Sequence, residues 1–258
     1  MKRRNFLRSS ALLAATGLSV TNSAFANPPL GEKEIYEWRV YHFKNGAQKR
    51  KLDEYYGNIL IPTLRGFGVK VGAFADYGKS EPPKGYYLLV YESFSEYNRS
   101  KNYLWSDISF LDRSKDFFEE TAKNATYLRF ETYLLEAFNS IPELRMPDPE
   151  RGIFELRTYE SSTEESAQRK IKMFNNEELA LFDEVGLHAT FFGEVLAGPQ
   201  MPALIYMLWF KDMEERDANW SKFRESTKWK RMRSKKEYAN TVSVVNKHFL
   251  LPMPHSQI

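Results

Sequence analysis

Hydrophobic and polar residues alternate along residues 35–41, and the same pattern returns 118 residues later along residues 153–159. In both stretches Glu, Arg and Tyr occupy every second position, and the positions between them are mostly apolar. A period of two is typical of a β-strand whose two faces meet different surroundings. The sequence therefore predicts one structural unit that occurs twice in the chain.

The first unit is predicted to run strand, helix, strand, strand, helix, strand. Pro62 is expected to kink the last turn of its first helix, and Gly66 with Gly68 to end that helix. Period-two patterns predict strands over 34–43, 69–77, 86–92 and 127–137, and helical spacing of apolar residues predicts helices over 47–65 and 95–121.

The second unit repeats this order. Its strands are predicted over 152–159, 187–196, 203–210 and 242–250, and its helices over 164–185 and 214–238. Between the units, three prolines within residues 142–149 exclude a helix or a central strand. The predicted organisation is a first repeat over 33–138, a Pro-rich linker over 139–151 and a second repeat over 152–251.

The fold class follows from this order of elements. Each unit should form an antiparallel sheet with both helices on one face, which is a ferredoxin-like (βαββαβ) arrangement of the α+β class. The two uncovered faces are expected to pack sheet to sheet, giving an intramolecular dimeric α/β-barrel. This packing predicts that Tyr36, Trp38 and Val40 lie under the helices. It places Glu37, Arg39 and Tyr41 toward the other repeat.

The N-terminus carries the pattern of an export signal. Arg3 and Arg4 precede a modestly apolar stretch over 11–20, and Ala-Phe-Ala follows at 24–26. This is typical of a twin-arginine signal peptide over residues 1–26 that is cleaved on export, which predicts a periplasmic or secreted protein. The apolar stretch is shorter than the roughly 20 residues that span a bilayer. We therefore expect no stable membrane anchor after cleavage.

Composition narrows the classes of partner and chemistry. Removing the signal removes four basic residues and no acid, so the formal charge changes from +3 to −1. A nearly neutral protein lacks the positive surface that tracks phosphates, and nucleic acid is not an expected partner. Cysteine is absent, which excludes disulfides and thiol catalysis. Nucleotide-binding glycine motifs and a G-x-S-x-G nucleophile motif are absent as well.

The repeated strands supply one group of candidate site residues. Glutamate and arginine lie two apart on one strand face, where buried charges persist only when they are paired. One interpretation is an ion-pair network between the repeats that fixes their register. The other is an active site, because buried pairs often carry perturbed carboxylates, with the tyrosines holding a polar ligand. The residues of this predicted inter-repeat polar network are Glu37, Arg39, Tyr41, Glu155, Arg157 and Tyr159.

His188 is the candidate catalytic residue. It is predicted on the second strand of the second repeat, where an imidazole is suited to act as a general base or a haem ligand. A hydrogen-bonded structural histidine is the alternative. The matching position in the first repeat is Lys70, so this role is not duplicated. The histidines lack metal-ligand spacing, and no metal site is predicted.

Two further motifs support a family resemblance. Residues 216–223 read R-D-A-N-W-S-K-F and residues 228–233 read K-W-K-R-M-R. Together with the E-x-R-x-Y strands and the order of elements, they resemble the NIPSNAP family of the dimeric α/β-barrel superfamily. The resemblance covers residues 33–251, although residues 97–105 depart from the motif. It implies the barrel fold, whereas most family members have no assigned reaction.

Relatives across the superfamily include cofactor-free monooxygenases, haem proteins and proteins with only a binding role. Their pockets usually open between sheet and helices, so the resemblance implies a pocket lined by Phe192, Tyr206, Trp209 and Trp220. We expect a protein that binds a small apolar or aromatic molecule. One hypothesis is that the protein is a cofactor-independent oxygenase or oxidoreductase. The alternative is a binding or structural module that catalyses no reaction. No cofactor is predicted, with haem as the open alternative, and oligomers beyond the pseudo-dimer are left open.

Overall fold

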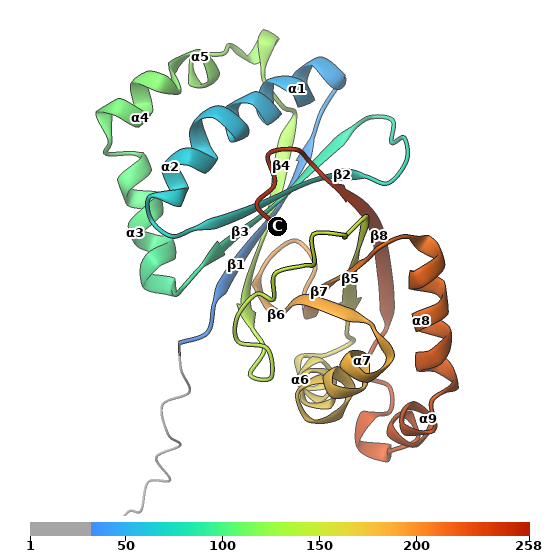
Figure 1. Cartoon of the computed structure of the whole chain (residues 1–258). Helices are drawn as coiled ribbons and strands as arrows, with labels where there is room; N and C mark the ends of the chain where they lie inside the picture. The colour runs from blue at the N-terminus through green and yellow to red at the C-terminus, as the bar shows by residue number, and fades with distance from the viewer. Residues whose placement is uncertain (1–31) are drawn as a thin grey trace, which may run out of the picture. The chain divides into compact units, whose positions relative to one another are not determined.

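The computed structural model describes residues 32–258, and the predicted signal peptide lies outside these residues. The described residues form a closed antiparallel β-barrel with helices packed on its outer surface (Figure 1). The predicted α+β class and central barrel are confirmed. None of the helices within residues 32–258 has the length and apolar character needed to cross a membrane.

The first half follows the predicted order of elements. Its strands are β1 (Ile35–His42), β2 (Lys70–Asp76), β3 (Lys84–Tyr91) and β4 (Arg129–Ala137). Between β1 and β2 run α1 (Gly46–Tyr55), the π-helical turn η1 (Tyr56–Leu60) and α2 (Ile61–Arg65). Between β3 and β4 run α3 (Phe94–Leu104), α4 (Ile108–Arg113), α5 (Lys115–Phe118) and the 3₁₀ turn η2 (Ala122–Asn124).

The second half has the same order. Its strands are β5 (Ile153–Glu160), β6 (His188–Ala197), β7 (Ala203–Phe210) and β8 (Val244–Pro252). The first connection contains α6 (Glu164–Met173), the π-helical turn η3 (Phe174–Glu178) and α7 (Leu179–Val185). The second contains α8 (Met213–Glu225), α9 (Thr227–Arg233) and the 3₁₀ turn η4 (Lys236–Tyr238).

The barrel closes through the edges of the two half-sheets. The strand order around it is β1-β3-β2-β8-β5-β7-β6-β4. The halves meet where β2 pairs with β8 and where β4 pairs with β6, both antiparallel. Helices α1 to α5 lie on one side of the barrel and α6 to α9 on the other (Figure 1). Each half therefore has its own helix layer over its own strands.

The barrel interior corrects the predicted strand faces. Tyr36 and Trp38 point into the barrel, in one buried cluster with Phe154 and Leu156 of the other half. Tyr36 packs on Phe191 with ring centroids 5.0 Å apart. Glu37, Arg39 and Tyr41 face the helices instead, so both predicted face assignments, including that of Val40, were inverted. The physical reason is that a closed barrel removes water from its interior, where apolar rings fill the space better than charges do.

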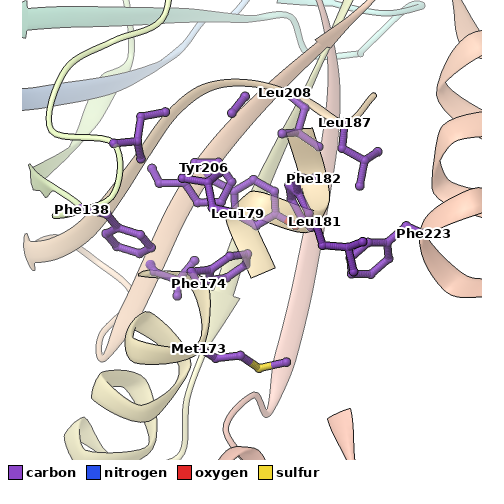
Figure 2. Close-up of a cluster of buried hydrophobic side chains, with 14 of the residues drawn as sticks. Phe138, Met173, Phe174, Leu179, Leu181, Phe182, Leu187, Tyr206, Leu208 and Phe223 are labelled. Atoms are coloured by element: carbon purple, nitrogen blue, oxygen red, sulfur yellow. The ribbon is translucent and has the colours of Figure 1, made fainter. Parts of the chain in front are cut away.

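The two remaining cores lie between the sheet and each helix layer. In the second half, Phe174 of η3 and Phe182 of α7 pack against Tyr206 of β7 (Figure 2). Phe192 stacks on the same tyrosine, with ring centroids 4.5 Å apart. These aromatic contacts hold α6, η3 and α7 on the outer face of the sheet.

Helix boundaries differ from the prediction where capping residues intervene. The predicted helix over 95–121 is three short helices, with Asp107 accepting backbone N–H bonds at the start of α4. The predicted helix over 214–238 is broken at Ser226, whose extended backbone separates α8 from α9. Side-chain caps compete with helix continuation at both places. Pro62 lies in the first turn of α2, directly after a π-helical turn, and Gly66 caps that helix.

The C-terminal residues extend the ordered structure beyond the predicted end of the second repeat. Strand β8 reaches only residues Phe74 to Asp76 of β2. The backbone N–H groups of Met253 and Gln257 donate to the carbonyls of Ala73 and Val71, which covers the rest of that edge. Ile258 is fully buried in the barrel cluster.

Candidate functional site

Each half contains a cavity between its sheet and its helices, and the E-x-R-x-Y side chains lie at both. The first cavity has a volume of about 460 Å³ and is lined by Glu37, Arg39 and Tyr41 together with residues of the α1–α5 layer. The second cavity has a volume of about 660 Å³ and is lined by Arg157 and Tyr159 together with residues of the α6–α9 layer. The repeated motif therefore marks two separate cavities.

Glu155 organises the floor of the second cavity. This fully buried carboxylate accepts hydrogen bonds from Arg157 Nε at 2.7 Å, from Arg216 Nε and Nη2 at 2.9 Å each, and from Trp220 Nε1 at 2.8 Å. Burial alone would raise its pKa, but the bonds from Arg216 and the charge of Arg157 outweigh burial and hold the pKa below the ordinary 4.5. Glu155 is therefore a carboxylate that positions two arginines.

Arg157 connects this floor to the aromatic wall. Its guanidinium carbon lies 3.6 Å from the centroid of the Trp220 ring, and Nη1 donates to Tyr159 Oη at 3.2 Å. Tyr206 in turn donates to Tyr159 Oη at 2.9 Å from the buried side. Stacking and hydrogen bonding fix the orientation of the guanidinium plane.

A second buried ion pair lines the same cavity. Lys170 Nζ lies 2.5 Å from Glu178 Oε2, and both side chains are buried. The ammonium also lies 4.3 Å from the centroid of the Phe174 ring. Burial raises the pKa of Glu178, and the nearby charge of Lys170 does not overcome that effect. Glu178 is the one carboxyl among the described lining residues of this cavity, and its proton affinity is increased.

Positive charge dominates the remaining wall of the second cavity. Arg224, Arg233 and Lys247 line it, and none of the three forms an ion pair with a carboxylate of residues 32–258. Burial and then the charge of Arg157 lower the pKa of Lys247. The like charges of Arg216 and Arg224 add to this shift, so Lys247 stands close to several positive charges. Its aromatic wall consists of Tyr159, Trp220, Phe223, Trp229 and Tyr238.

The first cavity has a similar floor with fewer charges. Glu37 accepts hydrogen bonds from Arg39 Nε and Nη2 and from Tyr91 Oη, each at 2.9 Å. Burial would raise the pKa of Glu37, but the charge of Arg39 lowers it below 4.5. Arg39 Nη1 donates to Tyr56 Oη at 3.1 Å, and Tyr41 Oη lies 3.0 Å from the same oxygen.

Strand and helix register show where the two cavities differ. In the first half, Thr132 of β4 pairs with Arg39 of β1. At the equivalent position of the second half, Lys247 of β8 pairs with Arg157 of β5. In the helices, Leu52 and Leu60 stand 118 positions before Lys170 and Glu178, and the same π-helical turn occurs in both halves. Lys247 and the Lys170–Glu178 ion pair of the second half thus correspond to a hydroxyl and two leucines in the first half.

The NIPSNAP family model matches residues 154–257. The second half of the chain carries a NIPSNAP domain. This domain contains the whole second cavity, because its lining runs from Arg157 to Lys247. No curated protein matches the sequence.

Solved structures extend the likeness to the whole barrel. A proposed monooxygenase from Lactobacillus acidophilus is 12% identical with a TM-score of 0.58, covering 86% of this chain and 94% of that one. A proposed monooxygenase from Fusobacterium nucleatum is 10% identical with a TM-score of 0.53, covering 86% and 93%. An anthrone oxidase-like protein is 8% identical with a TM-score of 0.53, covering 87% and 93%. At these identities the likeness shows the fold alone.

The predicted inter-repeat polar network is not formed. Glu37 pairs with Arg39 of its own half, and Glu155 pairs with Arg157 and Arg216 of the NIPSNAP domain. Tyr41 and Tyr159 bond within their own halves as well. The prediction was wrong because it placed these side chains on the face that proves to be the barrel interior.

His188 lies outside the cavity of the NIPSNAP domain. Its ring stacks on Trp209 at 4.3 Å, and Nε2 lies 3.3 Å from Glu215 Oε1. Trp209 pairs with Phe154 and packs against the barrel cluster, on the sheet face opposite Arg157. The residues that line the cavity do not include the candidate base, and the hydrogen-bonded structural alternative fits its contacts.

The predicted pocket residues separate into three positions. Trp220 lines the second cavity. Tyr206 and Phe192 are fully buried behind its wall, and Trp209 lies on the other face. The sequence reasoning missed Lys170, Glu178 and Lys247. Lys170 and Glu178 are equivalent to Leu52 and Leu60 of the first repeat. This exchange of two leucines for two charged residues was the signal in the sequence that could have identified them.

The donor sets of the two cavities bear on the open question of haem. Neither lining contains a histidine within residues 32–258, so an imidazole ligand is not at hand in either cavity. The described residues also hold no cluster of three His, Cys, Asp or Glu side chains placed to ligate a metal ion. The groups that the second cavity offers to a ligand are therefore its arginines, its lysines, the carboxylate of Glu178 and its aromatic rings.

Proposed function

We propose that the second cavity binds a small organic anion with an aromatic or apolar body. The observation that carries this proposal is the charge around the cavity. Six cationic side chains line it, against the single lining carboxylate of Glu178. The cationic residues are Arg157, Lys170, Arg216, Arg224, Arg233 and Lys247.

The charge balance leaves part of this positive field for a ligand. Arg157 and Arg216 are neutralised in part by Glu155, and Lys170 is paired with Glu178. The other three cations have no such partner within residues 32–258 and attract a carboxylate, sulfonate or phosphate group. Trp220, Phe223 and Trp229 then supply the apolar surface for the body of the ligand. The volume of about 660 Å³ suits a small organic molecule.

The wider architecture supports a binding role. The order of elements and strands in each half agrees with two tandem ferredoxin-like repeats that form an intramolecular pseudo-dimer. In such a barrel the helix layers stand apart from the barrel core, so a cavity beneath a helix layer does not interrupt the packing that closes the barrel.

Calorimetric titration with naphthoate tests the proposal on residues 27–258. We expect one bound naphthoate per chain and a roughly tenfold loss of affinity in Lys247→Thr, since one charge-assisted contact is removed. The matched control is Lys211→Thr, an exposed lysine outside the cavity, which should bind as the wild type does. Equal affinity of both variants would contradict the proposal.

A second candidate function is oxygen-dependent catalysis without a cofactor, and Glu178 is the observation that favours it. Its buried carboxylate lines the cavity, and its raised pKa increases its ability to hold a proton taken from an acidic phenol. For a dihydroxy aromatic, dioxygen then accepts two electrons and the remaining hydroxyl proton from the phenolate and the proton held by Glu178, which leaves a quinone and hydrogen peroxide. Oxygen uptake with dihydroxynaphthoate, compared between wild type and Glu178→Gln, tests this candidate. Equal uptake by the two proteins would reject it.

We further propose that the protein acts outside the cytoplasm. Arg3 and Arg4, the apolar stretch after them and the A-F-A sequence support twin-arginine export to the periplasm or medium. Replacing both arginines by lysine should leave the full-length precursor inside the cell, as measured by fractionation and mass. Unchanged export of that double variant would count against this route.

A further inference from the structure

We propose that the first cavity is a second, independent binding site, and that it takes neutral hydroxylated aromatic molecules such as phenols and naphthols. The two sites are separated by the barrel, because α1 to α5 and α6 to α9 cover different sides of it (Figure 1). No lining residue is shared between the two cavities. Ligand binding at one is therefore expected to proceed without occupancy of the other.

The floor of the first cavity is a built polar surface. Glu37 is buried and holds Arg39 through two parallel hydrogen bonds, which fixes the guanidinium plane. Tyr91 completes the bonding of that carboxylate, and Tyr56 accepts from Arg39. Groups held this firmly present a fixed donor and acceptor pattern to a ligand.

The walls of the first cavity are mainly aromatic. Tyr55 stacks on Phe117 at 3.9 Å between centroids, and Tyr41 stacks on Phe130 at 4.9 Å. Trp105 also lines the cavity and remains 65% exposed, so one large ring stands at its mouth. Flat rings arranged around a space of about 460 Å³ favour a flat aromatic ligand.

The charged residues of the first cavity do not favour an anionic ligand. Its charged lining residues are Glu37, Arg39 and Lys101. Arg39 is bound by Glu37, and Lys101 Nζ lies 3.7 Å from the same carboxylate. Leu60 lines the position that Glu178 occupies in the second cavity. The first cavity therefore lacks the surplus of cations that makes the second one electropositive.

Thr132 supplies the polar recognition group for a hydroxyl. It lines the cavity beside Arg39, and its buried Oγ1 has no hydrogen-bond partner within residues 32–258. A buried hydroxyl without a partner is unfavourable, and a ligand hydroxyl that donates to it or accepts from it removes that cost. A single ligand hydroxyl among aromatic walls matches this arrangement.

The test is calorimetric titration of residues 27–258 with naphthol, compared with naphthoate, which has the same ring and a negative charge. We expect one naphthol per chain. Thr132→Val, which keeps the shape and removes the hydroxyl, should lower naphthol affinity about threefold to tenfold. Thr132→Ser keeps the hydroxyl and should retain most of the affinity. Both variants should bind naphthoate as the wild type does, because Thr132 is remote from the second cavity.

Three outcomes would overturn the inference. The first is the absence of naphthol binding by the folded wild type. The second is equal loss of naphthol affinity in Thr132→Val and Thr132→Ser, which would indicate a packing effect in place of hydroxyl recognition. The third is loss of naphthol binding in Lys247→Thr, which would place the ligand in the second cavity. Naphthoate binding reports on the second cavity by itself, so failure of one proposal is distinguishable from failure of the other.

Discussion

In the first half Glu37 binds one arginine, whereas in the second half Glu155 binds two arginines and a tryptophan. The strand that carries each glutamate has the same place in the barrel, and the helix above it contains the same π-helical turn. The difference comes from the second helical segment, where α8 supplies Arg216 and Trp220. One scaffold thus holds two cavities whose charge is set by a few side chains.

The comparison indicates how specificity is divided within such a barrel. The Glu and Arg of the repeated motif form the cavity floor in both halves. In each half the glutamate accepts hydrogen bonds from the arginine and thereby orients its guanidinium. In the two proposed sites, the residues that select ligand charge lie outside the motif: Thr132 or Lys247 on the strand, and Leu60 or Glu178 on the helix.

The largest effect is expected from Glu155→Gln. It leaves Arg157 and Arg216 buried without their carboxylate, and removing one partner of a buried pair costs about 3–5 kcal/mol in free energy of unfolding. Glu37→Gln is the matched variant and should cost less, about 2 kcal/mol, since one arginine is involved. Denaturant unfolding measures both, and an equal cost would remove the distinction between the two floors.

The next effect concerns the ion pair that the first half lacks. Glu178→Leu should cost about 3 kcal/mol in unfolding free energy because Lys170 is left buried and charged. The double variant Lys170→Leu with Glu178→Leu installs the leucines found at positions 52 and 60, and it should unfold within about 1 kcal/mol of wild type. Costs that simply add in the double variant would show that the pair is not coupled.

A reciprocal exchange tests whether strand positions set ligand charge. Thr132→Lys should give the first cavity an additional naphthoate site, and Lys247→Thr should lower naphthoate affinity at the second cavity about tenfold. Titration stoichiometry separates the two results, with two naphthoates expected for Thr132→Lys and one for wild type. A stoichiometry unchanged by Thr132→Lys would assign selectivity to other residues.

The smallest effect is a difference in pH dependence. The folded-state pKa values of Glu37 and Glu155 lie below the ordinary 4.5, so each carboxylate stabilises the fold above that pH. This stability is lost as pH falls through the folded-state pKa. Thermal melting should therefore fall more steeply in acid for wild type than for Glu155→Gln. Parallel profiles would mean that Glu155 is not responsible.

Much of the fold was predictable because the alternation of residues 35–41 and 153–159 specifies strands directly. Alternation did not predict which strand face the helices cover. A period of two shows that a strand has two different faces, but it does not distinguish the barrel interior from the helix side. Strand pairing between β2 and β8 and between β4 and β6 decides this, and it involves residues far apart in sequence.

Lys170 and Glu178 show why part of the site was missed. Residues eight apart on a regular α-helix point about 80° away from each other. The π-helical turn at Phe174–Glu178 adds one residue, which brings the two side chains onto nearly the same face. Helical spacing in the sequence does not reveal such an insertion. The motif residues were recognised from their repetition, whereas this pair depends on local backbone geometry.

The central claim is that each half holds its own ligand and that charge decides which one. Crystals of residues 27–258 soaked separately with bromonaphthoate and bromonaphthol test it through the anomalous signal of bromine. We predict a bromonaphthoate peak beside Arg157 and Lys247, and a bromonaphthol peak beside Arg39 and Thr132. Both ligands in one cavity, or bromine in neither, would contradict the account.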